Sequence, residues 1–252
     1  MAMAQLPVYD RIGRDYGRGR RADPRIAAAI WTALADASLV LNVGAGAGSY
    51  EPRDRPVVAV EPSAVMLSQR PAGAAPAIRA LAEALPFADD AFDAALGMLT
   101  VHHWRDRATG LAELRRVARD RVVLFSRDPR AVPFWWLHHY FPATAALEAS
   151  RETPLSQLAE LLGGPLEVTP VPIPADCTDG FNAAYWRRPE AYLDPEVWRP
   201  MSAIALIPAA ERAAGQRALR ADLASGGWAR RFGQLLALDE LDLGYRVLTF
   251  RR

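Results

Sequence analysis

Short apolar runs, separated by polar and helix-like segments, set the pattern of the first half of the chain. The runs occupy residues 39–43, 57–60, 78–81, 92–99 and 121–125. Runs of this length without strict polar alternation are typical of strands that are buried on both faces. We therefore predict five strands of a largely parallel sheet in this half of the chain.

Helical patterns lie before and between these runs. Asp23 precedes Pro24, and this pair is typical of an N-cap followed by the first helical position. Leu111, Leu114 and Val117 repeat at helical spacing, which predicts an amphipathic helix over 106–119. Strands that alternate with helices are joined by right-handed crossovers, so the chain is expected to be an α/β protein with a doubly wound, Rossmann-like sheet.

The pattern changes after residue 128. Aromatic and helical segments follow, and the run 166–173 is predicted to be a strand that Pro170 and Pro172 restrict to an edge. Residues 245–251 are expected to form a closing strand. We expect an N-terminal lid and helix at residues 1–38 and an α/β core at 39–128. A helical cap should follow at 129–238, and the closing strand at 239–252.

A glycine-rich segment follows the first predicted strand. Gly44, Gly46 and Gly48 permit positive φ and close approach of a ligand to the backbone. Glu61 ends the second predicted strand, and ligands of doubly wound sheets bind outside the carboxyl ends of the strands. A carboxylate there can accept hydrogen bonds from both hydroxyls of a ribose. The combination predicts a ligand that contains a nucleoside.

The glycine segment differs from the dinucleotide fingerprint Gly-x-Gly-x-x-Gly, whose glycines open a full helix. Only residues 49–56 separate Gly48 from the second strand, and Pro52 and Pro56 interrupt them. At most one helical turn fits there, whereas a pyrophosphate is bound at the N-terminus of a real helix. This spacing argues against a dinucleotide.

Composition excludes several classes of protein. Cys177 is the only cysteine and none of the 30 basic residues is a lysine, which excludes an intrachain disulfide, a cysteine-based metal centre, a Schiff-base lysine and a Walker A motif. A formal net charge of +1 does not suit a nucleic-acid-binding protein. No apolar run approaches the roughly 18 residues of a membrane span, and no secretory signal is recognisable. We expect a cytoplasmic protein without a nucleic-acid or membrane partner.

Five segments, in order along the chain, carry a further signal. They are Asn42-Val-Gly-Ala-Gly-Ala-Gly48, Val57-Val-Ala-Val-Glu-Pro-Ser-Ala-Val-Met66, Ala82-Glu-Ala-Leu-Pro-Phe87, Phe92-Asp-Ala-Ala-Leu with Val101-His-His-Trp104, and Leu111-Ala-Glu-Leu-Arg-Arg-Val117. Together they resemble the class I S-adenosylmethionine-dependent methyltransferases, in the small-molecule branch that includes ubiquinone-type and trans-aconitate-type enzymes. The resemblance covers about residues 39–126. It implies a sheet of about seven strands, the last antiparallel, with S-adenosyl-L-methionine as the cofactor.

The resemblance also implies roles for individual residues. Those expected at the cofactor are Tyr16, Gly44, Ala45, Gly46, Gly48, Glu61, Pro62, Met66, Ala82, Glu83, Leu99 and Thr100. Glu61 would hold the ribose hydroxyls, Met66 would pack on the adenine, and Tyr16 would close over the cofactor. Three features depart from the family pattern. Asn42 replaces the acid that usually begins the first motif, and Leu81 replaces an aspartate that accepts from the adenine amino group in many relatives. Ala118-Arg-Asp-Arg121 replaces the glycine-rich turn common before the fifth strand, which we interpret as a tighter loop without functional meaning.

The chemistry that this family implies is a displacement at an activated methyl group. The protein positions the nucleophile, removes water and supplies a base where the nucleophile carries a proton. His103 is our candidate base because His103-Trp104 resembles the family and because adjacent residues should leave a strand end in opposite directions; a structural role for His103 is the alternative. No carboxylate has a spacing that predicts a metal site with the pairs His102-His103 and His138-His139.

Aromatic residues of the predicted cap bear on the methyl acceptor. They are Trp135, Trp136, Phe181, Tyr185, Trp186, Tyr192 and Trp198. They favour an apolar or aromatic small molecule, or alternatively they only attach the cap to the sheet. We predict an EC 2.1.1 enzyme, a monomer or homodimer, that methylates an oxygen, nitrogen or carbon of such a molecule. The alternatives are a related protein that binds the cofactor without methylating, as a scaffold or cyclisation catalyst, and an NAD-dependent oxidoreductase.

Overall fold

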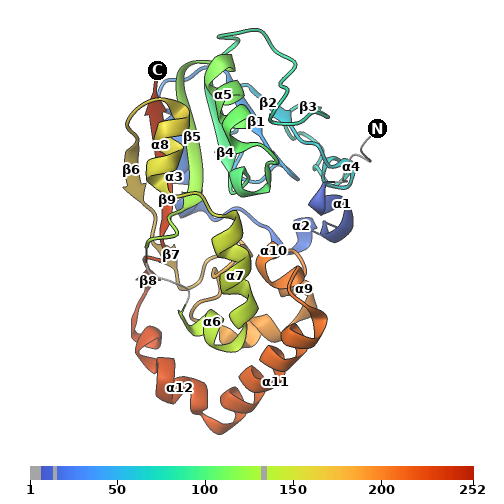
Figure 1. Cartoon of the computed structure of the whole chain (residues 1–252), viewed down its shortest axis with the longest axis vertical. Coiled ribbons are helices and arrows are strands. Elements are labelled where there is room, and N and C mark those ends of the chain that lie inside the picture. The colour runs from blue at the N-terminus through green and yellow to red at the C-terminus, as the bar shows by residue number, and fades with distance from the viewer. Residues whose placement is uncertain (1–6, 14–15, 132–134) are drawn as a thin grey trace.

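The computed structural model describes residues 7–13, 16–131 and 135–252, except for the side chains of Arg18 and Trp135 (Figure 1). Within this part of the chain, seven strands form one sheet in the order β3-β2-β1-β4-β5-β9-β6. They are β1 Val40–Val43, β2 Val57–Val60, β3 Ala77–Ile78, β4 Phe92–Met98, β5 Ala118–Arg127, β6 Glu167–Pro170 and β9 Tyr245–Arg251. Strand β9 pairs antiparallel with β5 and β6, and the other pairings are parallel. The predicted Rossmann-like sheet with an antiparallel last strand is confirmed.

Successive residues of the central strands pack on opposite faces of the sheet. Ala94 and Leu96 of β4 belong to one hydrophobic core, and Ala95 belongs to the other. Helix α3 (Pro24–Leu34) covers the first face, where it contacts β5 and β9. Helices α5 (Arg107–Val117) and α8 (Leu155–Leu162) contact each other on the second face (Figure 1). Burial on both faces explains why the strands are continuous apolar runs.

Helix α3 begins as the sequence predicts. The Asp23 carboxylate accepts a hydrogen bond from the backbone N–H of Arg25 at 3.0 Å, and Pro24 occupies the first turn. Its missing N–H costs nothing there because the first N–H groups of a helix have no intrahelical partner.

Two predicted strands are shorter than their apolar runs. The third run yields only β3, at one edge of the sheet, and the exposed fraction of the Leu81 side chain is 41%. The run 166–173 divides into β6, at the other edge, and β7 (Ile173–Pro174), which pairs with β8 (Glu240–Leu241) in a separate small sheet. Pro172 lies between them and has no N–H to continue a ladder.

A cap of helices lies beyond one end of the sheet (Figure 1). Its elements are α6 Trp135–Tyr140, α7 Pro142–Arg151, η2 Pro189–Leu193, α9 Pro195–Trp198, α10 Ser202–Ala205, α11 Ala209–Ser225, α12 Gly227–Phe232 and η3 Gly233–Ala237. Trp136, Trp186 and Tyr192 are at most 3% exposed and lie in the core that also contains α3. Of the described helices, none is both long and apolar enough to cross a membrane.

Two short N-terminal helices bridge the sheet and the cap. Helix α1 (Val8–Ile12) contacts α4 (Ala64–Leu67), which follows β2, and α2 (Tyr16–Gly19) contacts α9 of the cap. The Ser63 hydroxyl donates a hydrogen bond to the Asp10 carboxylate at 2.5 Å. The N-terminal segment is therefore fixed to both halves of the molecule (Figure 1).

Candidate active site

A cavity of about 570 Å³ lies at the carboxyl ends of β1, β2 and β4. This volume is within the range of roughly 300–1,000 Å³ that is usual for small-molecule and cofactor sites. The predicted site residues that border it are Tyr16, Gly44, Gly46, Glu61, Pro62, Met66, Ala82, Glu83, Leu99, Thr100 and His103. Ala45 and Gly48 were also predicted at the cofactor, but they do not border the cavity. We call this the larger cavity.

The glycine turn after β1 forms part of the wall. Gly44 has a φ of 69°, and a Cβ there would lie 1.9 Å from the Thr100 hydroxyl oxygen. Gly46 has a φ of 55°, and a Cβ there would lie 3.1 Å from the terminal methyl of Met66. The N–H groups of Gly44 and Ala45 both donate to the Val60 carbonyl, at 2.8 and 3.0 Å. The turn is thus tied to β2, and Gly44 and Gly46, which border the cavity, lack the side chains that would crowd Thr100 and Met66.

Glu61, at the end of β2, faces the glycine turn. Its carboxylate accepts from the N–H groups of Gly46 and Ser63, both at 2.8 Å. Burial raises the pKa of Glu61, while these two hydrogen bonds favour the ionised form. Residues 44–56 contain no helix, so the helix that would mark a dinucleotide site is missing between β1 and β2.

Met66, Ala82 and Glu83 also line the larger cavity. Met66 lies on α4, where its N–H donates to the Ser63 hydroxyl at 3.2 Å. One oxygen of Glu83 accepts from the N–H groups of Arg105 and Asp106, at 2.8 and 3.2 Å, so this side chain orders the segment before α5. That second role could not be anticipated from the motif.

Asn42, which stands where relatives have an acid, is buried beside a different acid. Its amide nitrogen donates to Glu51 at 3.1 Å, and Glu51 forms an ion pair with Arg70 at 2.8 Å. Neither Asn42 nor Glu51 borders the larger cavity. Asn42 therefore fixes the segment that follows the glycine turn.

Two histidines lie where β4 leads into the 3-10 turn η1 (Val101–His103). Both border the larger cavity, so the expectation that only one of them faces the site is wrong. They leave from a 3-10 turn, where successive side chains are about 120° apart, and not from a strand end. The His103 ring nitrogen Nε2 lies 3.3 Å from the Tyr9 hydroxyl. His102 borders a second cavity as well.

Burial keeps both imidazoles neutral. It lowers the pKa of His102 to about 4, assisted by the guanidinium groups of Arg151, Arg107 and Arg20. Burial and the neighbouring His102 hold the pKa of His103 well below its ordinary value. Only the neutral imidazole can accept a proton, and a pKa of about 4 makes His102 a weaker base than an ordinary histidine.

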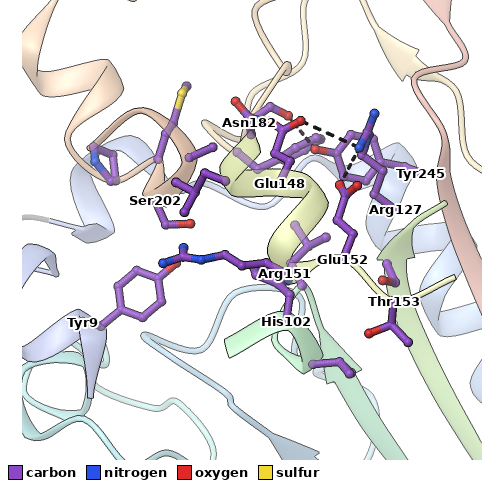
Figure 2. Close-up of a pocket in the computed structure, with 18 of the residues that line it drawn as sticks. Tyr9, His102, Arg127, Glu148, Arg151, Glu152, Thr153, Asn182, Ser202 and Tyr245 are labelled. Atoms are coloured by element: carbon purple, nitrogen blue, oxygen red, sulfur yellow. Dashed lines mark hydrogen bonds and ion pairs between the residues drawn. The ribbon is translucent and has the colours of Figure 1, made fainter. Parts of the chain in front are cut away.

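The second cavity, of about 100 Å³, lies between the sheet and the cap (Figure 2). We call it the smaller cavity. It shares Tyr9, Leu99, His102 and Arg151 with the larger cavity, so the two adjoin. Leu99 has a φ of 49°, a conformation that costs a non-glycine residue roughly 1–2 kcal/mol. This strained backbone lies at the junction of the two cavities.

Charged side chains line the smaller cavity. Arg127 of β5 forms an ion pair with Glu152, and Glu148 of α7 lies 3.1 Å from His138 Nε2. The amide nitrogen of Asn182 donates to the other Glu148 oxygen at 2.7 Å. Figure 2 shows Arg151 directed away from this cluster, toward Tyr9 and Ser202.

Most aromatic residues of the cap do not border either cavity. Trp136, Trp186 and Tyr192 pack in the core. Of the seven aromatic residues predicted to lie in the cap, Phe181 is the only one with a described side chain that borders the smaller cavity. The side chain of Trp135 lies outside the described part of the chain. These positions favour the alternative in which the aromatic residues attach the cap to the sheet.

Sequence reasoning missed several residues of the two cavities. His102 stands next to His103, and Tyr9 belongs to the same N-terminal segment as Tyr16; those positions in the sequence were the signal that could have found them. Arg151, Glu148 and Asn182 carry no local signal, because only the folded cap brings them to the end of the sheet. Among the described residues, no group of three or more His, Cys, Asp or Glu side chains could hold a metal ion.

Comparison with known proteins now adds to this geometry. Residues 41–125 match a family model described as a methyltransferase domain. A crystal structure from Anabaena variabilis ATCC 29413, described as a methyltransferase from an antibiotic biosynthesis pathway, is 34% identical. That match covers 92% of this chain and 98% of that chain, with a TM-score of 0.85. The comparison with curated proteins found no match.

Two more distant structures share the fold. A Thermotoga maritima S-adenosylmethionine-dependent methyltransferase, described as a possible histamine N-methyltransferase, is 21% identical; the match covers 66% of this chain and 84% of that chain, with a TM-score of 0.54. The [4+2]-cyclase SpnF is 17% identical, with 99% of each chain covered and a TM-score of 0.55. The sheet order, the glycine turn and the extended match at 34% identity agree: the chain belongs to the class I S-adenosylmethionine-dependent methyltransferases.

Proposed function

We propose that the chain transfers a methyl group from S-adenosylmethionine, bound in the larger cavity, to a small molecule bound in the smaller cavity. The observation that carries this proposal is the junction, where Tyr9, Leu99, His102 and Arg151 border both cavities. A single displacement requires two ligands to meet at one point from which water is excluded. Adjoining cavities at the carboxyl ends of the strands supply such a point.

The residues of the larger cavity suit the cofactor. Gly44 and Gly46 provide a cradle that a Cβ would fill, and the Glu61 carboxylate stands at the end of β2 where it can accept from ribose hydroxyls. Met66 offers an apolar surface to the adenine, as the family resemblance implies. When bound, the cofactor supplies an activated methyl group; the chain binds and orients both ligands and excludes water.

We assign the role of base to His102 and not to His103. His102 borders both cavities, whereas His103 borders only the larger one and lies within hydrogen-bonding distance of the Tyr9 hydroxyl. A base must reach the proton of the acceptor, so contact with the smaller cavity is the requirement that distinguishes them. His103 then positions Tyr9 over the junction.

The first experiment is a calorimetric titration with S-adenosylhomocysteine, with NAD as a control ligand. The proteins are the wild type, Glu61→Gln, and Glu211→Gln, which removes an exposed carboxylate on α11. We expect micromolar binding by the wild type and by Glu211→Gln. Loss of the charged acceptor in Glu61→Gln should weaken binding by about 10- to 100-fold. Binding of NAD in place of S-adenosylhomocysteine, or no binding at all, would refute the proposal.

A further inference from the structure

Arg151 differs from the other arginines that border the smaller cavity. Arg20 has an ion-pair partner in Asp179, and Arg127 has one in Glu152. The guanidinium of Arg151 forms no ion pair and no hydrogen bond with any described residue. It is the last residue of α7, where a cation suits the helix dipole, but its guanidinium points across the junction of the cavities (Figure 2).

The surroundings of Arg151 are costly for a cation. Burial lowers the pKa of Arg151, and no described carboxylate pairs with its guanidinium. The two nearby imidazoles are neutral and supply no counter-charge. A partly buried charge without a partner is unfavourable unless a ligand supplies the counter-charge. A carboxylate is the planar group that a guanidinium binds best.

Unpaired polar atoms lie in the same cavity. Asn182 Oδ1 and the Thr153 hydroxyl are buried and have no hydrogen-bond partner among the described residues. The amide of Asn182 is fixed in orientation, because its nitrogen faces Glu148 and a carboxylate only accepts. Asn182 Oδ1 therefore needs a donor, such as a hydroxyl or an N–H group, from a ligand.

A cationic acceptor fits these groups less well. An ammonium group needs a free carboxylate, but Glu152 already pairs with Arg127, and Glu148 already contacts His138 and Asn182. Of the described charged side chains that line the smaller cavity, Arg151 alone forms no ion pair. The volume of about 100 Å³ corresponds to roughly three waters, which limits the ligand, or the end of it that enters, to a compact group.

We propose that the acceptor is a compact carboxylate that also carries a hydroxyl or N–H group, with Arg151 binding its carboxylate and Asn182 Oδ1 accepting from its donor. This inference rests on the proposed function, because it assigns the smaller cavity to the acceptor. It replaces the expectation of an apolar or aromatic acceptor, which depended on aromatic residues that pack in the core. Arg151 and Asn182 are then the specificity-determining residues.

The test uses protein saturated with S-adenosylhomocysteine, titrated with glycolate, lactate and 3-hydroxypropanoate and with the amide of each. At least one acid should bind, and its amide should bind at least tenfold more weakly. Arg151→Gln should weaken binding of that acid by about 10- to 100-fold and leave the amide nearly unchanged. Arg107→Gln is the matched control, because Arg107 also lowers the pKa of His102 but borders neither cavity.

A second arm tests the donor. Lactate differs from propionate by one hydroxyl, so the ratio of their affinities measures the contribution of that hydroxyl. This ratio should fall in Asn182→Leu even if both affinities change. Unchanged discrimination would remove Asn182 from the proposal.

Failure of this inference is distinguishable from failure of the proposed function. If wild type does not bind S-adenosylhomocysteine, the proposed function fails first. If it binds, but none of the acids binds or acids and amides bind equally, the carboxylate inference is overturned. If Arg151→Gln weakens S-adenosylhomocysteine binding as strongly as Glu61→Gln does, Arg151 serves the cofactor and the inference is likewise overturned.

Discussion

The Asp179 carboxylate of the cap accepts two hydrogen bonds from the Arg20 guanidinium of the N-terminal segment, at 2.6 Å from Nε and 3.1 Å from Nη2. Asp179 is fully buried and the Arg20 side chain is 9% exposed. The Tyr50 hydroxyl, beyond the glycine turn, donates to the same carboxylate at 2.9 Å. One buried acid thus joins the N-terminal segment, the segment after the glycine turn and the cap.

Replacement of this acid should loosen the N-terminal segment. Asp179→Asn leaves Arg20 as a buried cation without a counter-charge, so the free energy of unfolding should fall by roughly 3 kcal/mol. Urea unfolding measures this change. Asp176→Asn is the control, because Asp176 pairs with Arg25 while its own side chain is 81% exposed; that loss should stay below about 1 kcal/mol. Equal losses in the two variants would contradict the linking role of Asp179.

The glycine turn should not tolerate a side chain. In Gly44→Ala, the new Cβ would overlap the Thr100 hydroxyl in a backbone conformation that alanine rarely adopts, so affinity for S-adenosylhomocysteine should fall at least tenfold. Gly73→Ala imposes a similar positive φ of 84° with no atom within 4 Å. Calorimetry should therefore show near wild-type affinity for Gly73→Ala, and loss of affinity there too would assign the effect to global instability.

Acid should destabilise the protein through its buried imidazoles. The folded-state pKa of His102, about 4, lies below its ordinary value of 6.5, so the unfolded chain binds more protons between these values. The stability that neutral His102 contributes is complete above pH 6.5 and is lost as pH falls toward 4. The slope is at most about 1.4 kcal/mol per pH unit for each imidazole. Melting temperatures from pH 7.5 to 4.5 should fall less steeply in His102→Gln than in the wild type or in the exposed-site variant His139→Gln.

The charged cluster of the smaller cavity should also be sensitive to removal of one partner. Arg127→Gln leaves Glu152 and Glu148 without their guanidinium neighbour, and the free energy of unfolding should fall by about 3–5 kcal/mol. Arg251→Gln breaks an ion pair with Glu167 in which both side chains are more than 60% exposed, so its loss should be within about 1 kcal/mol. Chemical denaturation of both variants compares the two pairs directly.

Substitution of His102 and of His103 should lower kcat to different extents. With an acceptor whose nucleophile carries a proton, His102→Gln should lower kcat by about 10²- to 10⁴-fold, the usual contribution of a general base. His103→Gln should have a smaller effect, which Tyr9→Phe should reproduce, because both changes break the same contact. A larger kcat loss in His103→Gln would return the role of base to His103.

The parts that sequence predicted well are local in the chain. Gly44, Gly46 and Glu61 stand at the ends of two strands that pair in parallel, so strand ends and glycine spacing suffice to bring them together. The Asp23 cap follows from two adjacent residues. The expectation that only one of His102 and His103 faces the site was wrong because the pair leaves from a 3-10 turn, whose side-chain directions differ from those of a strand end.

The parts that sequence could not predict depend on distant contacts. Arg20 and Asp179 are 159 positions apart, and nothing near Arg20 indicates a buried partner. In the sequence, Arg151 resembles any cation at the end of a helix. Only the folded structure shows that no described carboxylate pairs with it. The lining of the smaller cavity is therefore visible only in three dimensions.

The small sheet formed by β7 and β8 has an evolutionary consequence. The Ala175 N–H donates to the Asp239 carbonyl at 2.8 Å, so the two ends of the segment 175–239 lie side by side. We call this segment the excursion. Phe181, Asn182 and Ser202, which belong to this excursion, border the smaller cavity and not the larger one. Because the entropy of closing a loop grows only slowly with its length, insertions in the excursion that keep Asp179 and the contact of Asn182 with Tyr245 of β9 should cost little stability. Descendants of such a scaffold can alter what the smaller cavity admits while they inherit the glycine turn unchanged.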